Sequence, residues 1–142
     1  GLDAIVSEWT VARRRLIELF GPEAGHWYVP PWNRIGPEVA VKLADIGFRA
    51  VSTFAANDLG LAPPMLQRNT HVDIIDWRGG RIGRPAGAVL GDLADALGLA
   101  RRDHWRPVGI LLHHLVHDAT AWATLDAIMD EVSTHPAARW SH

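Results

Sequence analysis

The 142-residue sequence contains no cysteine. This absence excludes disulfides, thiolate metal sites and cysteine nucleophiles, so any metal would have to be held by His, Asp or Glu. The sequence also lacks an excess of positive charge, because 14 Lys and Arg stand against 16 Asp and Glu and the formal net charge is -2. No basic field therefore favours a nucleic acid or an anionic membrane as a partner.

Long apolar runs are also missing, since none approaches the roughly 20 residues that cross a bilayer. The sequence does not begin with a charged segment followed by a short apolar one, as a secretory signal would. We therefore expect a soluble protein without a membrane partner, with the cytoplasm favoured over export. The first residue is Gly1, and Leu2 already belongs to a helical pattern, which suggests that the true N-terminus is missing.

Hydrophobic residues make up 48% of the sequence, which is ample for one core at this length. We therefore expect a single domain over residues 1–142. Apolar spacings of three and four predict helices over residues 2–20, 37–46 with Gly47 as terminator, 88–97 closed by Gly98, and 121–132. In the last of these, we expect Trp122, Leu125, Ile128, Met129 and Val132 to point inward.

Extended patterns predict strands over residues 26–29, 48–54, 70–77 and 108–112, the last fully buried, and a loop over residues 57–68. Strands that alternate with helices are typical of βαβ units around a parallel sheet, so the predicted class is α/β. About four strands suffice for a small three-layer sandwich or for an arc of a closed barrel. An arc would leave an open sheet edge, through which a homo-oligomer could form.

Polar residues gather where the predicted strands end. In parallel sheets, functional residues lie just beyond the C-terminal ends of the strands, so we expect these residues to share one rim. They are Pro30 to Arg34 after the first strand, Ser52 and Thr53 after the second, His71, Asp73, Asp76 and Trp77 on the third, and His113, His114, His117 and Asp118 after the fourth.

Three short motifs in this set occur in a fixed order: Val29-Pro-Pro-Trp-Asn-Arg34, Asp73-Ile-Ile-Asp-Trp77 and Gly109-Ile-Leu-Leu-His113. Their order and spacing resemble the third, fourth and fifth motifs of the polysaccharide deacetylase family with the NodB-homology fold, over roughly residues 25–135. The resemblance implies the C-terminal part of a (β/α)7 barrel, about four βα units long. It also implies a hydrolase that removes N-acetyl groups from an amino-sugar glycan, with an N-acetylated sugar or polysaccharide as partner.

The resemblance also implies roles for single residues. His113 matches the catalytic acid, and Asp76 matches the carboxylate that holds and charges it. The groove wall that contacts substrate is matched by Pro31, Trp32, Asn33 and Arg34. Three further candidates for substrate binding are Trp77, His71 and Asp73. If the third strand alternates regularly, Asp73 and Asp76 point to opposite faces, and we rank Asp76 first.

Two departures from the family pattern affect the expected activity. Val29 stands where the family usually has Arg, so only Arg34 could replace that contact, from a different position. The Asp-Asp pair and the His-x-x-x-His that hold the family's zinc-like divalent metal would precede residue 1. Because such a metal lowers the pKa of bound water from about 15.7 to about 7, we expect this chain alone to be inactive.

Several other interpretations stay open. His113, His114 and His117 could form a metal site of their own, since residues four apart on a helix share a face, but His117 and Asp118 could instead cap the last helix. A catalytically dead remnant could keep a carbohydrate-binding or structural role through Trp32 and Trp77. An unrelated α/β hydrolase is disfavoured because no Gly-x-Ser-x-Gly occurs. The remaining tryptophans considered, Trp9, Trp122 and Trp140, are predicted to pack.

Overall fold

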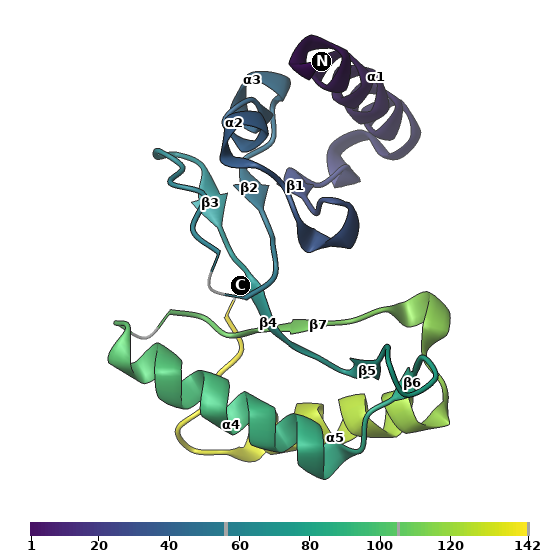
Figure 1. Cartoon of the computed structure of the whole chain (residues 1–142), viewed down its shortest axis with the longest axis vertical. Helices are drawn as coiled ribbons and strands as arrows, with labels where there is room; N and C mark the ends of the chain where they lie inside the picture. Colours follow the sequence, from purple (N-terminus) through teal and green to yellow (C-terminus); the bar gives the residue numbers. More distant parts are fainter. Residues whose placement is uncertain (56, 105, 142) are drawn as a thin grey trace. The chain divides into compact units, whose positions relative to one another are not determined.

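The computed structural model of the chain describes residues 1–55, 57–104 and 106–141 (Figure 1). Where the length predicts a single domain, the contacts divide the chain into two compact units, unit 1 over Gly1–Asn69 and unit 2 over Thr70–His142. Each unit has a hydrophobic cluster of its own. The cluster of unit 1 includes Leu43 and Val51, and that of unit 2 includes Ile74 and Ile128.

Unit 1 begins with the long helix that the apolar spacing predicts, α1 over Leu2–Phe20. A 3-10 turn, Gly21–Glu23, leads from it to a parallel sheet with the order β1-β2-β3. The strands are short: β1 is Trp27–Tyr28, β2 is Ala50–Val51 and β3 is Leu66–Gln67. β3 lies in a segment predicted to be a loop, because two paired residues are too few to carry an alternating pattern.

The second predicted helix is present in two pieces, α2 over Pro37–Ala40 and α3 over Leu43–Ile46. Both contribute to the core of unit 1, since Ala40 and Leu43 are fully buried. Gly47 ends α3 with a φ of 95°, as predicted, because this left-handed conformation carries little steric cost without a Cβ. The chain then turns directly into β2.

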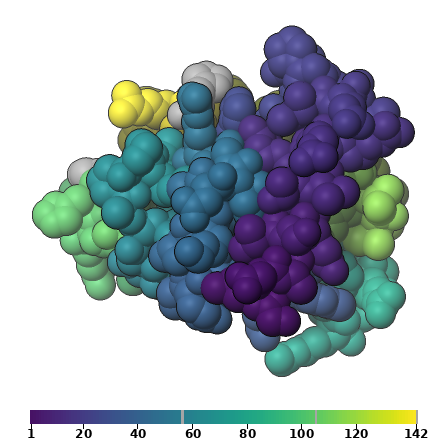
Figure 2. Space-filling model, turned by 90° about the horizontal axis from the view of Figure 1, so that it is seen from above, coloured from purple at the N-terminus to yellow at the C-terminus, as the bar shows by residue number. Residues whose placement is uncertain are grey.

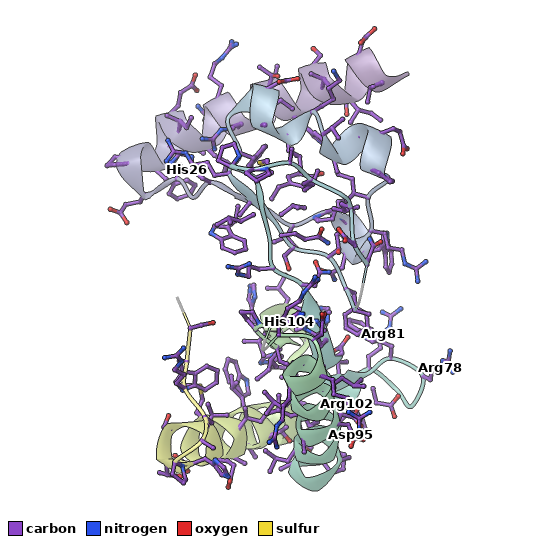
Figure 3. All side chains as sticks on the ribbon, turned by 90° about the vertical axis from the view of Figure 1, so that its left-hand side faces the viewer. His26, Arg78, Arg81, Asp95, Arg102 and His104 are labelled. Carbon is purple, nitrogen blue, oxygen red and sulfur yellow. The ribbon has the colours of Figure 1, made fainter. Side chains whose placement is uncertain are left out.

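α1 packs onto the sheet of unit 1 through one face. Trp9 meets Tyr28 with ring centroids 4.6 Å apart, which confirms that Trp9 packs. Arg13 on the same face is buried, and its Nη2 lies 2.8 Å from Nδ1 of His26, which Figure 3 shows beside α1. Other side chains of α1 form part of the surface visible in Figure 2, in purple.

Unit 2 contains two separate strand pairs. β4, Thr70–Asp73, pairs in parallel with β7, Gly109–Leu111, and β5, Ile75–Asp76, forms an antiparallel hairpin with β6, Ile82–Gly83. The strand predicted over residues 70–77 is therefore broken at Ile74. Two long helices, α4 over Ala86–Arg102 and α5 over Ala119–Thr134, pack against each other and lie on one side of β4 and β7 (Figure 1).

Three predictions for unit 2 were wrong in detail. α4 continues through Gly98 to Arg102, because a helix tolerates an interior glycine at a cost of only about 1 kcal/mol. β7 is partly exposed, not fully buried. In α5, Ile128 is buried as expected, but Trp122 is 49% exposed and Met129 is also exposed. The buried stripe of α5 is Ala121, Thr124 and Ile128, and a residue one position further is rotated by about 100° away from it.

The molecule thus mixes helices with small parallel sheets, as in the α/β class. Within the described residues, no barrel is closed. Among the helices of those residues, none combines the length and the apolar character needed to cross a membrane.

Candidate functional site

A pair of ionisable side chains lies at the C-terminal edge of the β4–β7 pair. Nε2 of His113 lies 3.2 Å from Oδ2 of Asp73, and the two side chains are 25% and 19% exposed. The same Oδ2 accepts a hydrogen bond of 2.9 Å from the indole Nε1 of Trp77. One carboxylate oxygen therefore joins an imidazole and an indole, and we refer to Asp73, Trp77 and His113 as the Asp73 site.

The chain brings these residues together through strand register and a local turn. Asp73 pairs with Leu111 across the two parallel strands, so His113, two residues further on, emerges at the same edge as Asp73. Oδ1 of Asp73 accepts a hydrogen bond of 2.9 Å from the backbone N–H of Ile75. This bond to the backbone two residues on turns the chain at Ile74 and carries Trp77 back towards Asp73.

A hollow of about 290 Å³ opens beside the Asp73 site. Trp77 stands edge-on to His113, with ring centroids 4.7 Å apart and an interplanar angle of 88°, and it remains 45% exposed. The residues that line the hollow are Trp77, Leu112, His113, His114, Leu115 and Val116. The hollow is thus mainly apolar, with an imidazole in its wall, and Leu112, Leu115 and Val116 are lining residues that the sequence did not single out.

His117 supports the backbone of His113. Its Nε2 lies 3.1 Å from the backbone N–H of His113 and accepts from it, while its ring stands edge-on to Trp122 at 4.6 Å. His114 is exposed. In the part of the chain that the structure describes, no three His, Asp or Glu side chains gather closely enough to hold a metal ion.

Asp118 caps α5, as the competing interpretation of this segment expected. Its Oδ1 accepts hydrogen bonds of 2.8 Å from the backbone N–H of Ala121 and 3.1 Å from that of Gly83. These backbone donors, Ala121 first, hold the pKa of the Asp118 carboxyl below its ordinary value. The cap thereby ties the start of α5 to β6.

Asp76 is not the carboxylate beside His113, so the pairing implied by the resemblance needs correction. Its Oδ1 accepts hydrogen bonds from the backbone N–H groups of Arg78, at 3.0 Å, and Gly79, at 2.7 Å. Asp76 thus closes the turn of the β5–β6 hairpin. The bend at Ile74 places Asp73 at the strand edge that His113 reaches, and leaves Asp76 to the hairpin.

His71 serves the pairing of β4 with β7. Its Nδ1 accepts a hydrogen bond of 3.1 Å from the backbone N–H of Gly109, at the start of β7. Burial lowers the pKa of His71, which favours the neutral ring that this acceptor role requires. His71 therefore contacts the opposite end of β7 from His113.

Pro31, Trp32, Asn33 and Arg34 belong to unit 1, where Pro31–Asn33 forms a 3-10 turn after β1. Trp32 and Asn33 adopt left-handed φ values of 58° and 53°. The indole of Trp32 is 90% exposed, and Arg34 is exposed as well. Oδ1 of Asn33 is buried and has no hydrogen-bond partner among the described residues. A mouth shared by Trp32, Asp76 and His113 stays a prediction.

Unit 1 has a polar network at the ends of β2 and β3. Oδ1 of Asn69 accepts hydrogen bonds from the backbone N–H of Thr53 at 3.1 Å, the Thr53 hydroxyl at 2.8 Å and Nε2 of Gln67 at 3.0 Å. Nδ2 of Asn69 donates to the carbonyls of Ala55 and Asn57. This uncharged network holds the loop after β2.

Sequence reasoning also missed Arg84, whose Nη1 donates a hydrogen bond of 2.8 Å to the backbone carbonyl of Asp73. A contact between residues 11 positions apart, across a hairpin, follows no helix or strand period. The only local signal is Pro85, which precedes α4 and places Arg84 just outside the helix.

The Asp73 site fixes the orientation of an imidazole. A carboxylate at 3.2 Å from Nε2 orients the imidazole of His113, and the other ring nitrogen, Nδ1, is then the one that can serve a ligand. Trp77 and Leu115 offer apolar surface at the same place. Comparisons with protein-family models, with curated proteins and with solved structures found no match to this chain.

Proposed function

We propose that the chain is the C-terminal part of a (β/α)7 polysaccharide-deacetylase-like hydrolase, which removes N-acetyl groups from an amino-sugar glycan. The observation that supports this most directly is the Asp73 site, a His-carboxylate pair at a strand edge beside a half-exposed indole and a mainly apolar hollow. The motif order supports it as well, since two of the three motifs supply these residues.

His113 takes the role of the general acid in this proposal. During hydrolysis the C–N bond of the amide breaks, the oxygen of water stays on the acyl carbon as acetate, and the amine nitrogen takes a proton. With Nε2 of His113 against Asp73, that proton comes from Nδ1. Asp73 holds the ring in place through this contact.

Trp77 provides the contact with sugar or with the acetyl methyl group. An indole that is half exposed and fixed through its Nε1 presents a flat apolar face at little cost in side-chain entropy. Leu112 and Leu115 extend this apolar surface around the hollow.

The zinc-like metal of the family does not fit the described residues, which offer no group of three ligands. In the proposed full-length protein, its ligands belong to segments upstream of Gly1. The isolated chain accordingly binds glycan but releases no acetate.

A second candidate function is glycan binding without turnover, and the two exposed indoles favour it. Trp32 is 90% and Trp77 45% exposed. Exposed aromatic faces can stack on sugar rings whether or not the protein also hydrolyses the glycan. The two candidates differ only in whether the protein releases acetate.

Both candidates are tested with chito-oligosaccharides, using this chain and a version extended upstream. We expect both forms to bind, and Trp77→Ala to weaken binding in both. Acetate release is expected only from the extended form, and His113→Ala should lower it by about 10²–10⁴ while binding is kept. His104→Ala is the matched control, because His104 is an exposed histidine of unit 2 that does not line the hollow.

The possible results of this experiment bear on the two candidates and on the role of His113 in different ways. Binding without acetate release by the extended form would select the second candidate. A failure of both forms to bind chito-oligosaccharides would overturn both. Acetate release that His113→Ala leaves unchanged would remove His113 from the proposed role.

A further inference from the structure

Arg84 joins the strand edge of unit 2 to both of its long helices. Its Nη1 donates a hydrogen bond of 2.8 Å to the backbone carbonyl of Asp73, and its Nη2 lies 2.6 Å from Oδ2 of Asp92 on α4. Its own backbone N–H donates to the carbonyl of Ile74 at 2.9 Å, and its carbonyl accepts from the hydroxyl of Thr124 on α5 at 2.7 Å. The strand edge and both helices therefore meet at this residue.

The bond to Asp73 occurs where the strand ladder stops. β4 ends at Asp73, where its pairing with β7 stops. The backbone carbonyl of Asp73 therefore needs a hydrogen-bond donor from outside the strand pair. The guanidinium provides one, and its second nitrogen is held at the same time by Asp92. A planar fork with two separate donors can make both contacts together, which a single ammonium group does less well.

The position of the Asp73 backbone determines where its carboxylate lies. That carboxylate accepts from the N–H of Ile75, from the indole of Trp77 and from His113, all within 3.2 Å. A displacement of the backbone by a fraction of an ångström would lengthen the side-chain contacts. Arg84 touches neither Trp77 nor His113 in any of its hydrogen bonds, so its influence on them passes through Asp73.

We propose that Arg84, anchored by Asp92, is a positioning residue that holds Asp73 in contact with Trp77 and His113. The importance of this role for catalysis rests on the proposed function, but the geometric role does not. A test that reads geometry directly can therefore fail or succeed independently of glycan binding.

The test uses the indole N–H signals of the full chain labelled with ¹⁵N-tryptophan, with the Trp77 signal assigned through Trp77→Phe. In Arg84→Met, we expect the Trp77 signal to shift and its N–H to exchange with water about tenfold faster, as for a weakened hydrogen bond. The indole of Trp140, which donates to Ser133 at 3.2 Å, is the internal control and should not change.

Two further variants separate positioning from general stability. Arg84→Lys should restore part of the Trp77 shift, since an ammonium group can still reach one acceptor. Arg78→Met is the matched control, because Arg78 lies on the β5–β6 turn with its side chain extended away from the rest of unit 2 (Figure 3), and it should leave the Trp77 signal unchanged.

Asp92→Asn decides the case if Arg84→Met does not fold. It keeps the guanidinium but weakens its anchor, so a smaller Trp77 shift in the same direction supports the proposal. An unchanged Trp77 signal in either folded variant overturns it, as does an equal change at Trp77 and Trp140. Loss of chito-oligosaccharide binding in the parent chain would count against the proposed function only.

Discussion

The two units treat the carboxyl ends of their parallel strands differently. In unit 1, uncharged side chains form the hydrogen-bonded network there, in which Asn69 bonds to Thr53, to Gln67 and to the loop carbonyls. In unit 2, the corresponding edge holds the carboxylate of Asp73 against the imidazole of His113, and His113 lines a hollow. The amide of Asn69 makes all its hydrogen bonds inside the fold and thereby stabilises a loop. The imidazole of His113 remains partly exposed, so a ligand can reach it.

The largest expected loss of stability comes from substitutions in the hydrophobic cores, and it tests whether the two units unfold separately. Ile128→Ala in unit 2 and Leu43→Ala in unit 1 each remove a fully buried side chain and should lower the free energy of unfolding of their own unit by about 2–5 kcal/mol. Because the hydrophobic clusters share no residue, we expect each variant to speed amide hydrogen exchange in its own unit only. Equal acceleration in both units would show that they unfold together.

A smaller effect separates the two polar edges. Asn69→Ala leaves Thr53 and the loop carbonyls without their partner and should cost about 1–3 kcal/mol, measured from the urea midpoint of unit 1. Asp73→Asn in unit 2 should cost less, about 1 kcal/mol, because the single amide oxygen can keep the bond from the Ile75 N–H, while the amide NH2 replaces the oxygen that accepts from the half-exposed indole of Trp77. A larger loss for Asp73→Asn would mean that Asp73 is chiefly a structural residue.

Local patterns in the sequence predicted the helices and several of their ends. α1, α5 and the left-handed Gly47 follow from spacing and from caps, which depend on residues within one or two turns. Gly98 was misleading because a local signal to stop a helix is weak against the packing of α4 on α5. The two-residue β3 exists only through its partner strand, so its own residues contain no pattern that would reveal it.

The site was predictable in its membership but not in its pairing. The principle that strand ends carry function named Asp73, Trp77 and His113 within a larger set, in which Asp76 was ranked above Asp73. The choice between Asp73 and Asp76 depends on the bend at Ile74, which the Asp73 carboxylate itself stabilises. Such a side-chain turn interrupts the alternation on which the ranking of the two carboxylates was based.

The response to pH should also differ between the units. The neutral ring of His71 accepts from Gly109, and burial lowers its pKa below the ordinary 6.5, so the unfolded chain binds the proton more readily. The stability of unit 2 is therefore expected to be complete above pH 6.5 and to fall as the pH drops through the lowered pKa. Burial raises the pKa of Tyr28 above 10.0, so unit 1 should lose stability as the pH rises beyond 10.

The measurement for this prediction is the urea midpoint of each unit as a function of pH. His71→Gln keeps a side-chain acceptor that does not titrate and should flatten the acid limb for unit 2. Tyr28→Phe should flatten the alkaline limb for unit 1. Unit 2 also contains Asp118, whose lowered pKa adds a loss of stability below its ordinary 3.8. An acid limb that begins below pH 6.5 and is the same in His71→Gln as in the parent would contradict the assignment to His71.

The smallest expected effect distinguishes the two exposed tryptophans. Trp32 holds a left-handed φ of 58° with its indole in solvent, so Trp32→Gly should relieve about 1 kcal/mol of strain, partly offset by the greater freedom of glycine in the unfolded chain. Trp77→Ala should instead lower stability, because its indole bonds to Asp73 and packs against His113. The direction of each stability change is measured as the shift of the urea midpoint. Trp32→Ala is the control, because it removes the indole but keeps a residue for which the left-handed φ is strained. A midpoint lowered by Trp32→Gly would mean that the indole packs within unit 1. A raised midpoint would mean that unit 1 holds this indole in solvent at a cost to its own stability, as expected of a side chain kept for contact with a ligand.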